Sequence, residues 1–120
     1  MGNHYLLNLY ECSFVRLNDE HFLMDLLENA AEASGASVVQ TIYKKFYPQG
    51  VTVLSLLEES HISIHTWPEK GEAAVDIFTC GDALPKIGCD IIIRQMDCDN
   101  HHLTHIERWL NSIMTKLFLM

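Results

Sequence analysis

The residues whose types and order could carry chemistry gather in one short stretch. Ser60 places a hydroxyl nucleophile directly after Glu59, at the start of a run that alternates apolar and polar side chains up to Trp67. A second run, from Glu72 to Cys80, ends on a thiol. Enzymes use hydroxyls and thiols as nucleophiles, and thiols also transfer protons. We therefore interpret the two runs as a hairpin that carries chemistry.

The register of this hairpin follows from its turn. Four residues, 68–71, join the runs, which is a common hairpin length. A straight hairpin then has Trp67 opposite Glu72. The same register places Glu59 opposite Cys80, so we expect the thiol beside the peptide bond that follows Glu59.

Two histidines in the first run raise the question of a metal site. His61 and His65 are four residues apart, but Ile62 and Ile64 alternate with them as in a strand. In a strand the two rings are separated by about 13 Å, at ~3.3 Å per residue, so they cannot share one ion. The usual cysteine pairs of zinc sites are also missing, and we expect no metal.

The bulk composition limits the domain count and the partners. The chain has 120 residues, of which 48% are hydrophobic, so we expect a single domain over 1–120. The net charge of -8 argues against nucleic acid and anionic membrane surfaces, and it suits a cationic small molecule. No apolar run approaches the ~20 residues of a membrane span, and the start lacks a signal peptide, so we expect a cytoplasmic protein.

The cysteine spacing gives no framework for disulfides or zinc. None of the four cysteines forms a Cys-x-x-Cys pair with another. We expect free thiols at all four positions, Cys12, Cys80, Cys89 and Cys98.

The remaining segments predict the elements that position the hairpin. Asn18 or Asp19 can cap a helix whose apolar residues recur at helical spacing until Ser34 and Gly35 end it. We further expect strands over 4–12, 38–47, 51–57 and 101–107, a second helix over 84–96 and a helical tail over 109–120. This order predicts an α+β fold, a two-layer sandwich of a mostly antiparallel sheet with helices packed on one face.

The hairpin also carries a family resemblance. Residues 59–69 (ESHISIHTWPE) and 73–81 (AAVDIFTCG) resemble the signature of the prokaryotic S-adenosylmethionine decarboxylases. Gly2-x-His4, residues 33–36 (ASGA) and 46–51 (FYPQGV) also fit that family. The resemblance extends through about Glu107, whereas the apolar end over 109–120 differs from the expected tail.

The resemblance implies a pyruvoyl enzyme made by self-processing. Ser60 Oγ would attack the Glu59 carbonyl, and the resulting ester would eliminate to give a 1–59 β chain and a 60–120 α chain. The serine would become a pyruvoyl group, which forms a Schiff base with the substrate and replaces a pyridoxal cofactor as electron sink. Cys80 matches the family's general acid, although a lone strand cysteine is more often a small core residue.

His65 matches the base of the elimination step, which raises a problem of distance. Five extended residues separate it from Ser60, or about 16 Å at ~3.3 Å per residue. We therefore predict a homodimer with shared active sites, in which one chain supplies Ser60 and Cys80. The other chain supplies Thr52, His65, Glu69 and Phe46. Thr52 stands where the family usually has a serine that assists processing.

The resemblance also suggests how a nucleoside substrate would bind. Glu69 would accept both ribose hydroxyls, Phe46 with Tyr10 would sandwich adenine, and Glu59 would also contact substrate. Phe46 could equally be a core aromatic. The implied reaction yields the aminopropyl donor for spermidine synthesis. Two alternatives remain open, namely a scaffold that decarboxylates ornithine or arginine and an unprocessed homologue that only binds a ligand or partner.

Overall fold

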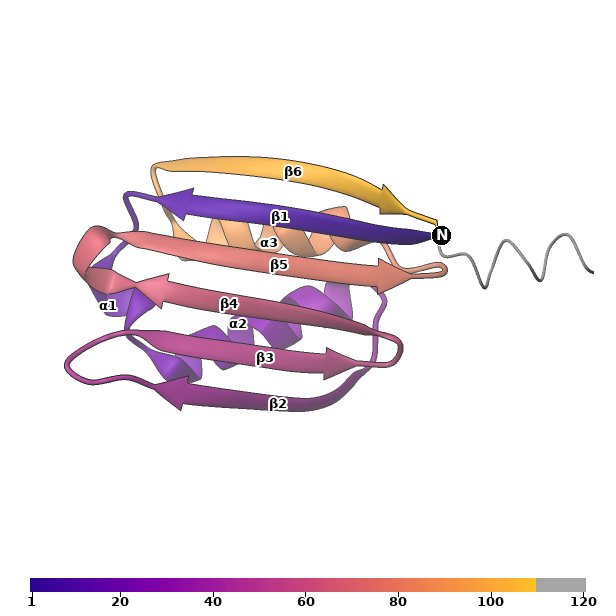
Figure 1. The fold of residues 1–120 in the computed structure, drawn as a ribbon. Coiled ribbons are helices and arrows are strands. Elements are labelled where there is room, and N and C mark those ends of the chain that lie inside the picture. The colour runs from indigo at the N-terminus through magenta and orange to yellow at the C-terminus, as the bar shows by residue number, and fades with distance from the viewer. Residues whose placement is uncertain (110–120) are drawn as a thin grey trace, which may run out of the picture.

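A single antiparallel sheet backed by helices forms the protein, and the computed structural model describes residues 1–109. Figure 1 shows the six strands side by side, with the helices α2 and α3 behind them. The strand order is β2-β3-β4-β5-β1-β6, and every neighbouring pair is antiparallel. The α+β two-layer sandwich with helices on one face is therefore confirmed.

The elements follow the predicted order with two short additions, a single-turn helix after the first strand and a 3-10 turn within the hairpin connection. In chain order they are β1 (Gly2–Tyr10), α1 (Phe14–Leu17), α2 (Glu20–Ala33), β2 (Val38–Lys45), β3 (Val51–Leu57), β4 (Ser60–Trp67), the 3-10 turn η1 (Pro68–Lys70), β5 (Glu72–Cys80), α3 (Pro85–Met96) and β6 (Asn100–Arg108).

The longest helix, α2, begins and ends where its sequence predicts. Of the two candidate caps, Asp19 is the one used, because its carboxylate accepts the backbone N–H of Phe22 at 3.0 Å. Gly35 ends the helix in a left-handed conformation with φ 83°. One helix face is buried against the sheet, through Leu23, Leu26, Leu27, Ala30 and Ala31.

The central hairpin has the predicted register. Trp67 pairs with Glu72 and His61 with Phe78 along β4 and β5. Gly71 closes the turn with φ 68°, and a Cβ there would meet the backbone oxygen of Cys12 at 3.4 Å. The turn after β4 is thus packed tightly against the segment that follows β1.

Alternate strand residues face opposite sides of the sheet. On β3, Val51, Val53 and Leu57 are buried beneath the helices, whereas Leu54 and Leu56 are exposed. Within residues 1–109 the helices lie on one side of the sheet only (Figure 1), and we call the other side the open face. By the strand registers it carries Leu6 of β1, Ile42 of β2, Leu54 and Leu56 of β3, His61, Ser63, His65 and Trp67 of β4, Asp76, Phe78 and Cys80 of β5, and Ile106 of β6.

The expectation of four free thiols is wrong, because Cys12 and Cys98 form a disulfide. The two cysteines are 86 positions apart, but β1 and β6 are antiparallel neighbours, so the segment after β1 meets the segment before β6. Only this pairing of distant strands brings the two sulfurs together. Cys80 and Cys89 are free.

The predicted helical tail over 109–120 lies almost entirely outside the described residues, which end at Trp109. Within residues 1–109, no helix has both the length and the apolar character needed to cross a membrane.

Candidate active site

Ser60 opens β4 immediately after a tight turn. It pairs with Leu57 of β3, so only Glu58 and Glu59 connect the two strands. Glu59 adopts a left-handed backbone conformation with φ 61°. For a residue with a side chain this conformation costs roughly 1–2 kcal/mol. The peptide bond between Glu59 and Ser60 therefore follows a strained residue.

Ser60 and Cys80 line the same hollow, as the hairpin register predicts. The hollow measures about 230 Å³, and both residues are half-buried in it. Its other walls are Gly35, Ala36, Ser37, Glu58, Asp82 and Ala83. The turn is anchored here, because the backbone N–H of Glu58 donates to the oxygen of Ser37 at 3.2 Å. Glu58 and Asp82 make the rim acidic, which favours a cationic ligand.

A second hollow, of about 330 Å³, gathers most of the other predicted site residues. Phe46, Thr52, His65 and Glu69 all line it. The remaining walls are Gln49, Gly50, Thr66 and Trp67, which sequence reasoning did not single out. The Thr52 hydroxyl and His65 Nδ1 share a hydrogen bond of 2.9 Å.

The two hollows lie at opposite ends of β4. In the register with β3, Ser60 pairs with Leu57 at one end and His65 pairs with Thr52 near the other. Ser60 and His65 are therefore separated by about 16 Å of extended chain, as the residue spacing predicts. Within one chain the structure does not bring these two residues together.

Tyr10 and Glu59, the other predicted substrate contacts, lie apart from Phe46. Tyr10 lines a neighbouring hollow with Glu72, and Trp67 borders both that hollow and the one that contains Phe46. Glu59 is exposed at the turn before Ser60. One chain alone therefore does not form the predicted sandwich of Phe46 and Tyr10.

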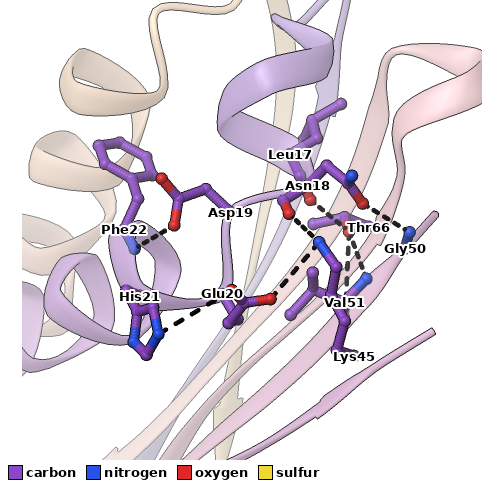
Figure 2. Close-up of polar contacts among 10 residues, drawn as sticks. All are labelled: Leu17, Asn18, Asp19, Glu20, His21, Phe22, Lys45, Gly50, Val51 and Thr66. Atoms are coloured by element: carbon purple, nitrogen blue, oxygen red, sulfur yellow. Dashed lines mark hydrogen bonds and ion pairs between the residues drawn. The ribbon is translucent and has the colours of Figure 1, made fainter. Parts of the chain in front are cut away.

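A buried polar network anchors the second hollow from the helix side (Figure 2). The Thr66 hydroxyl donates to the backbone oxygen of Leu17 at 2.8 Å and accepts the N–H of Val51 at 2.9 Å. Asn18 Oδ1 accepts the N–H of Gly50 at 3.0 Å. The link between α1 and α2 thus holds the start of β3 and the end of β4.

An aromatic cluster occupies the open face near the Ser60 end. Phe78 contacts the rings of His4 and His61, with centroids 5.7 and 5.9 Å away. The guanidinium of Arg108 lies 4.9 Å from the Phe78 centroid. A Cβ on Gly2 would lie 2.7 Å from the Phe78 ring, which is too close, so a residue with a side chain at position 2 would displace the ring.

The two free thiols differ in their surroundings. Cys89 is fully buried, and this burial raises the pKa of its thiol to about 12. It therefore stays protonated and unreactive at neutral pH. Cys80 lies in the Ser60 hollow, which leaves it as the free thiol placed for chemistry. Among residues 1–109, no group of three His, Cys, Asp or Glu side chains could hold a metal ion.

Comparison with known proteins decides the family. The chain matches the family described as S-adenosylmethionine decarboxylase over residues 3–109. The chain belongs to the S-adenosylmethionine decarboxylase family. The resemblance carried by the hairpin motif is thereby confirmed.

Individual S-adenosylmethionine decarboxylase relatives cover nearly the whole chain. The S-adenosylmethionine decarboxylase proenzyme of Prochlorococcus marinus strain MIT 9313 is 48% identical, over 90% of this chain and 87% of that protein. The proenzyme of Bacillus velezensis is 38% identical, over 97% of this chain and 92% of that protein. The crystal structure of the adenosylmethionine decarboxylase of Aquifex aeolicus VF5 superposes with a TM-score of 0.85 at 35% identity, covering 92% of each chain.

Proposed function

We propose that this protein decarboxylates S-adenosylmethionine, using a pyruvoyl group that it makes from its own Ser60. The observation that carries the proposal is that Ser60 and Cys80 line one acidic hollow in a chain of this family. Ser60 also directly follows Glu59, whose backbone is strained. The product would be the aminopropyl donor for spermidine synthesis. A substrate with an amine and a sulfonium suits the acidic rim of Glu58 and Asp82.

Self-processing would begin at the turn before β4. Ser60 Oγ attacks the carbonyl carbon of Glu59, the peptide C–N bond breaks, and the acyl group moves to oxygen as an ester. A base then removes the Cα proton of residue 60, which expels Glu59 as a carboxylate. The remaining enamine takes up water and loses ammonia. The left-handed conformation of Glu59 raises the energy of the intact peptide and so favours the first step.

The pyruvoyl group that results supplies a carbonyl electrophile and an electron sink, which ordinary side chains lack. Around it, this chain's own residues have separate tasks. Cys80, in the same hollow, donates the proton that the substrate's α-carbon takes up after carbon dioxide leaves. Glu69 accepts the ribose hydroxyls and Phe46 stacks on adenine, both from the second hollow.

The separation of the two hollows supports a homodimer. The open face exposes several large apolar side chains, including Ile42, Leu54 and Leu56, which a second copy would cover. In an isologous contact between two open faces, β4 can run antiparallel to its partner. The His65 end of one chain then lies over the Ser60 end of the other. Each active site would take Ser60 and Cys80 from one chain and Phe46, Thr52, His65 and Glu69 from its mate.

Complementation between inactive variants tests the shared site. Neither Ser60→Ala nor His65→Ala should process alone. Co-expressed, the two should form heterodimers in which an intact Ser60 meets an intact His65, and cleaved chains should appear. An absence of cleavage in verified heterodimers contradicts the shared site.

An assay of carbon dioxide release tests the substrate. Purified protein is supplied with carboxyl-labelled S-adenosylmethionine, ornithine or arginine in parallel. We expect labelled gas from S-adenosylmethionine alone, and none from Ser60→Ala. Release from ornithine or arginine instead would overturn the substrate assignment, and an intact chain without any release would overturn the enzyme function.

A further inference from the structure

We infer that Gln49 is a positioning residue for substrate recognition, because it fixes the carboxylate of Glu69 from a turn that Asn18 holds in place. This inference rests on the proposed function and adds a determinant of nucleoside specificity to it. The two residues lie on different elements. Gln49 belongs to the turn between β2 and β3, and Glu69 belongs to η1 after β4.

The contact between the two side chains is direct. Gln49 Nε2 donates a hydrogen bond of 3.0 Å to Glu69 Oε2. Glu69 is exposed, whereas Gln49 is half-buried in the wall of the second hollow. Within residues 1–109, no ion pair or second side-chain hydrogen bond holds this carboxylate. Its orientation therefore depends on Gln49.

A fixed carboxylate matters for a ligand with two adjacent hydroxyls. A carboxylate offers about four acceptor positions on its two oxygens. Gln49 occupies one of them on Oε2, which sets the plane of the group and leaves the others for a diol. Without this bond the exposed side chain of Glu69 samples several rotamers, and binding must restrict them again.

Gln49 can act in this way only if its own backbone is held. The turn that carries it closes on itself, because the N–H of Phe46 donates to the oxygen of Gly50 at 2.8 Å. From the helix side, Asn18 Oδ1 accepts the N–H of Gly50. Figure 2 shows this bond beside the contact of Lys45 Nζ with the backbone oxygen of Asn18.

Lys45 extends the same anchor into α2. Its ammonium group lies 3.4 Å from Glu20 and is largely buried. The backbone oxygen of Asn18 thus accepts a hydrogen bond from Lys45, while its side chain accepts one from the turn at Gly50. The arrangement fixes Gln49 on one side of the hollow, and the Thr66 network fixes the strand that leads to Glu69 on the other.

The inference is tested by steady-state kinetics on processed enzyme with S-adenosylmethionine. In Gln49→Ala we expect the KM to rise about 3- to 10-fold with kcat nearly unchanged, which is the usual net contribution of one solvent-exposed hydrogen bond. Asn18→Ala should do the same, and Asn18→Asp, which keeps an acceptor oxygen, should restore most of the affinity. Gln95→Ala, an exposed glutamine on α3, is the matched control and should leave the KM unchanged.

An analogue of S-adenosylmethionine without the ribose hydroxyls separates positioning from general damage to the pocket. If Gln49 acts through Glu69 on the diol, Gln49→Ala should no longer raise the KM for this analogue, so that the ratio of the variant KM to the wild-type KM is about 1. An equal rise in KM with S-adenosylmethionine and with the analogue overturns the inference. So does a wild-type KM for S-adenosylmethionine in Gln49→Ala. A wild-type chain that neither cleaves nor releases carbon dioxide overturns the proposed function itself, and the inference with it.

Discussion

The hydroxyl of Thr52 lies 2.9 Å from Nδ1 of His65, across the antiparallel pair of β3 and β4. The bond occupies one ring nitrogen, and among residues 1–109 Nε2 has no hydrogen-bond partner. It also fixes the plane of an imidazole that is otherwise exposed. In the dimer that we propose, Nε2 would be the base that acts on residue 60 of the partner subunit.

Removal of the Thr52 hydroxyl should therefore slow self-processing. Thr52→Val keeps the shape of the side chain but breaks the bond, so we expect cleavage to slow about 10-fold, as part of a general-base contribution of ~10²–10⁴. Thr52→Ser keeps the hydroxyl and should cleave at close to the wild-type rate. Time courses of cleavage on reducing gels measure both. A wild-type rate in Thr52→Val contradicts the role given to this hydrogen bond.

The strain at Glu59 gives a second prediction. Glycine adopts a positive φ without cost, so Glu59→Gly should relax the intact turn and slow cleavage roughly 5- to 10-fold, as expected for about 1 kcal/mol. Glu59→Ala keeps the strain and removes only the carboxylate. It should therefore cleave faster than Glu59→Gly. Equal rates in the two variants would show that the backbone conformation contributes nothing.

The disulfide gives a third prediction, because Cys12 lies before the proposed cleavage site and Cys98 after it. Cleavage at Glu59 would leave the two fragments covalently joined. Processed protein should therefore migrate as one species on a non-reducing gel and as two after reduction. In Cys98→Ser the fragments should separate under both conditions. Fragments that separate without reduction in the wild type would show that the disulfide is not formed.

The buried thiol gives a fourth prediction. Burial raises the pKa of Cys89 to about 12, so almost none of it is thiolate at pH 8. In folded protein, iodoacetamide should label Cys80 and spare Cys89 until urea exposes it. Peptide mapping after alkylation identifies the labelled residue. Rapid labelling of Cys89 in the folded state would contradict its burial.

Local patterns were sufficient to predict much of this architecture. The helical spacing after Asp19 determined α2, and the four-residue turn over 68–71 determined the hairpin register, because each depends on residues close in sequence. The single-turn helix α1 is too short to show a period. The spacing along β4 also predicted that one chain could not bring Ser60 and His65 together.

Contacts between distant segments were beyond such reasoning. The Cys12–Cys98 pair depends on β6 adding to the outer edge of β1, and no motif near either cysteine encodes that order. The bond from Gln49 to Glu69 likewise joins two turns that meet only once β3 and β4 are paired.

The mass of the purified, folded protein under reducing conditions tests the central claim most directly. Self-processing predicts two species, residues 1–59 and residues 60–120 with an amino-terminal pyruvoyl group, and a single uncut species for Ser60→Ala. A single uncut chain of 120 residues in the reduced wild-type protein would contradict the account.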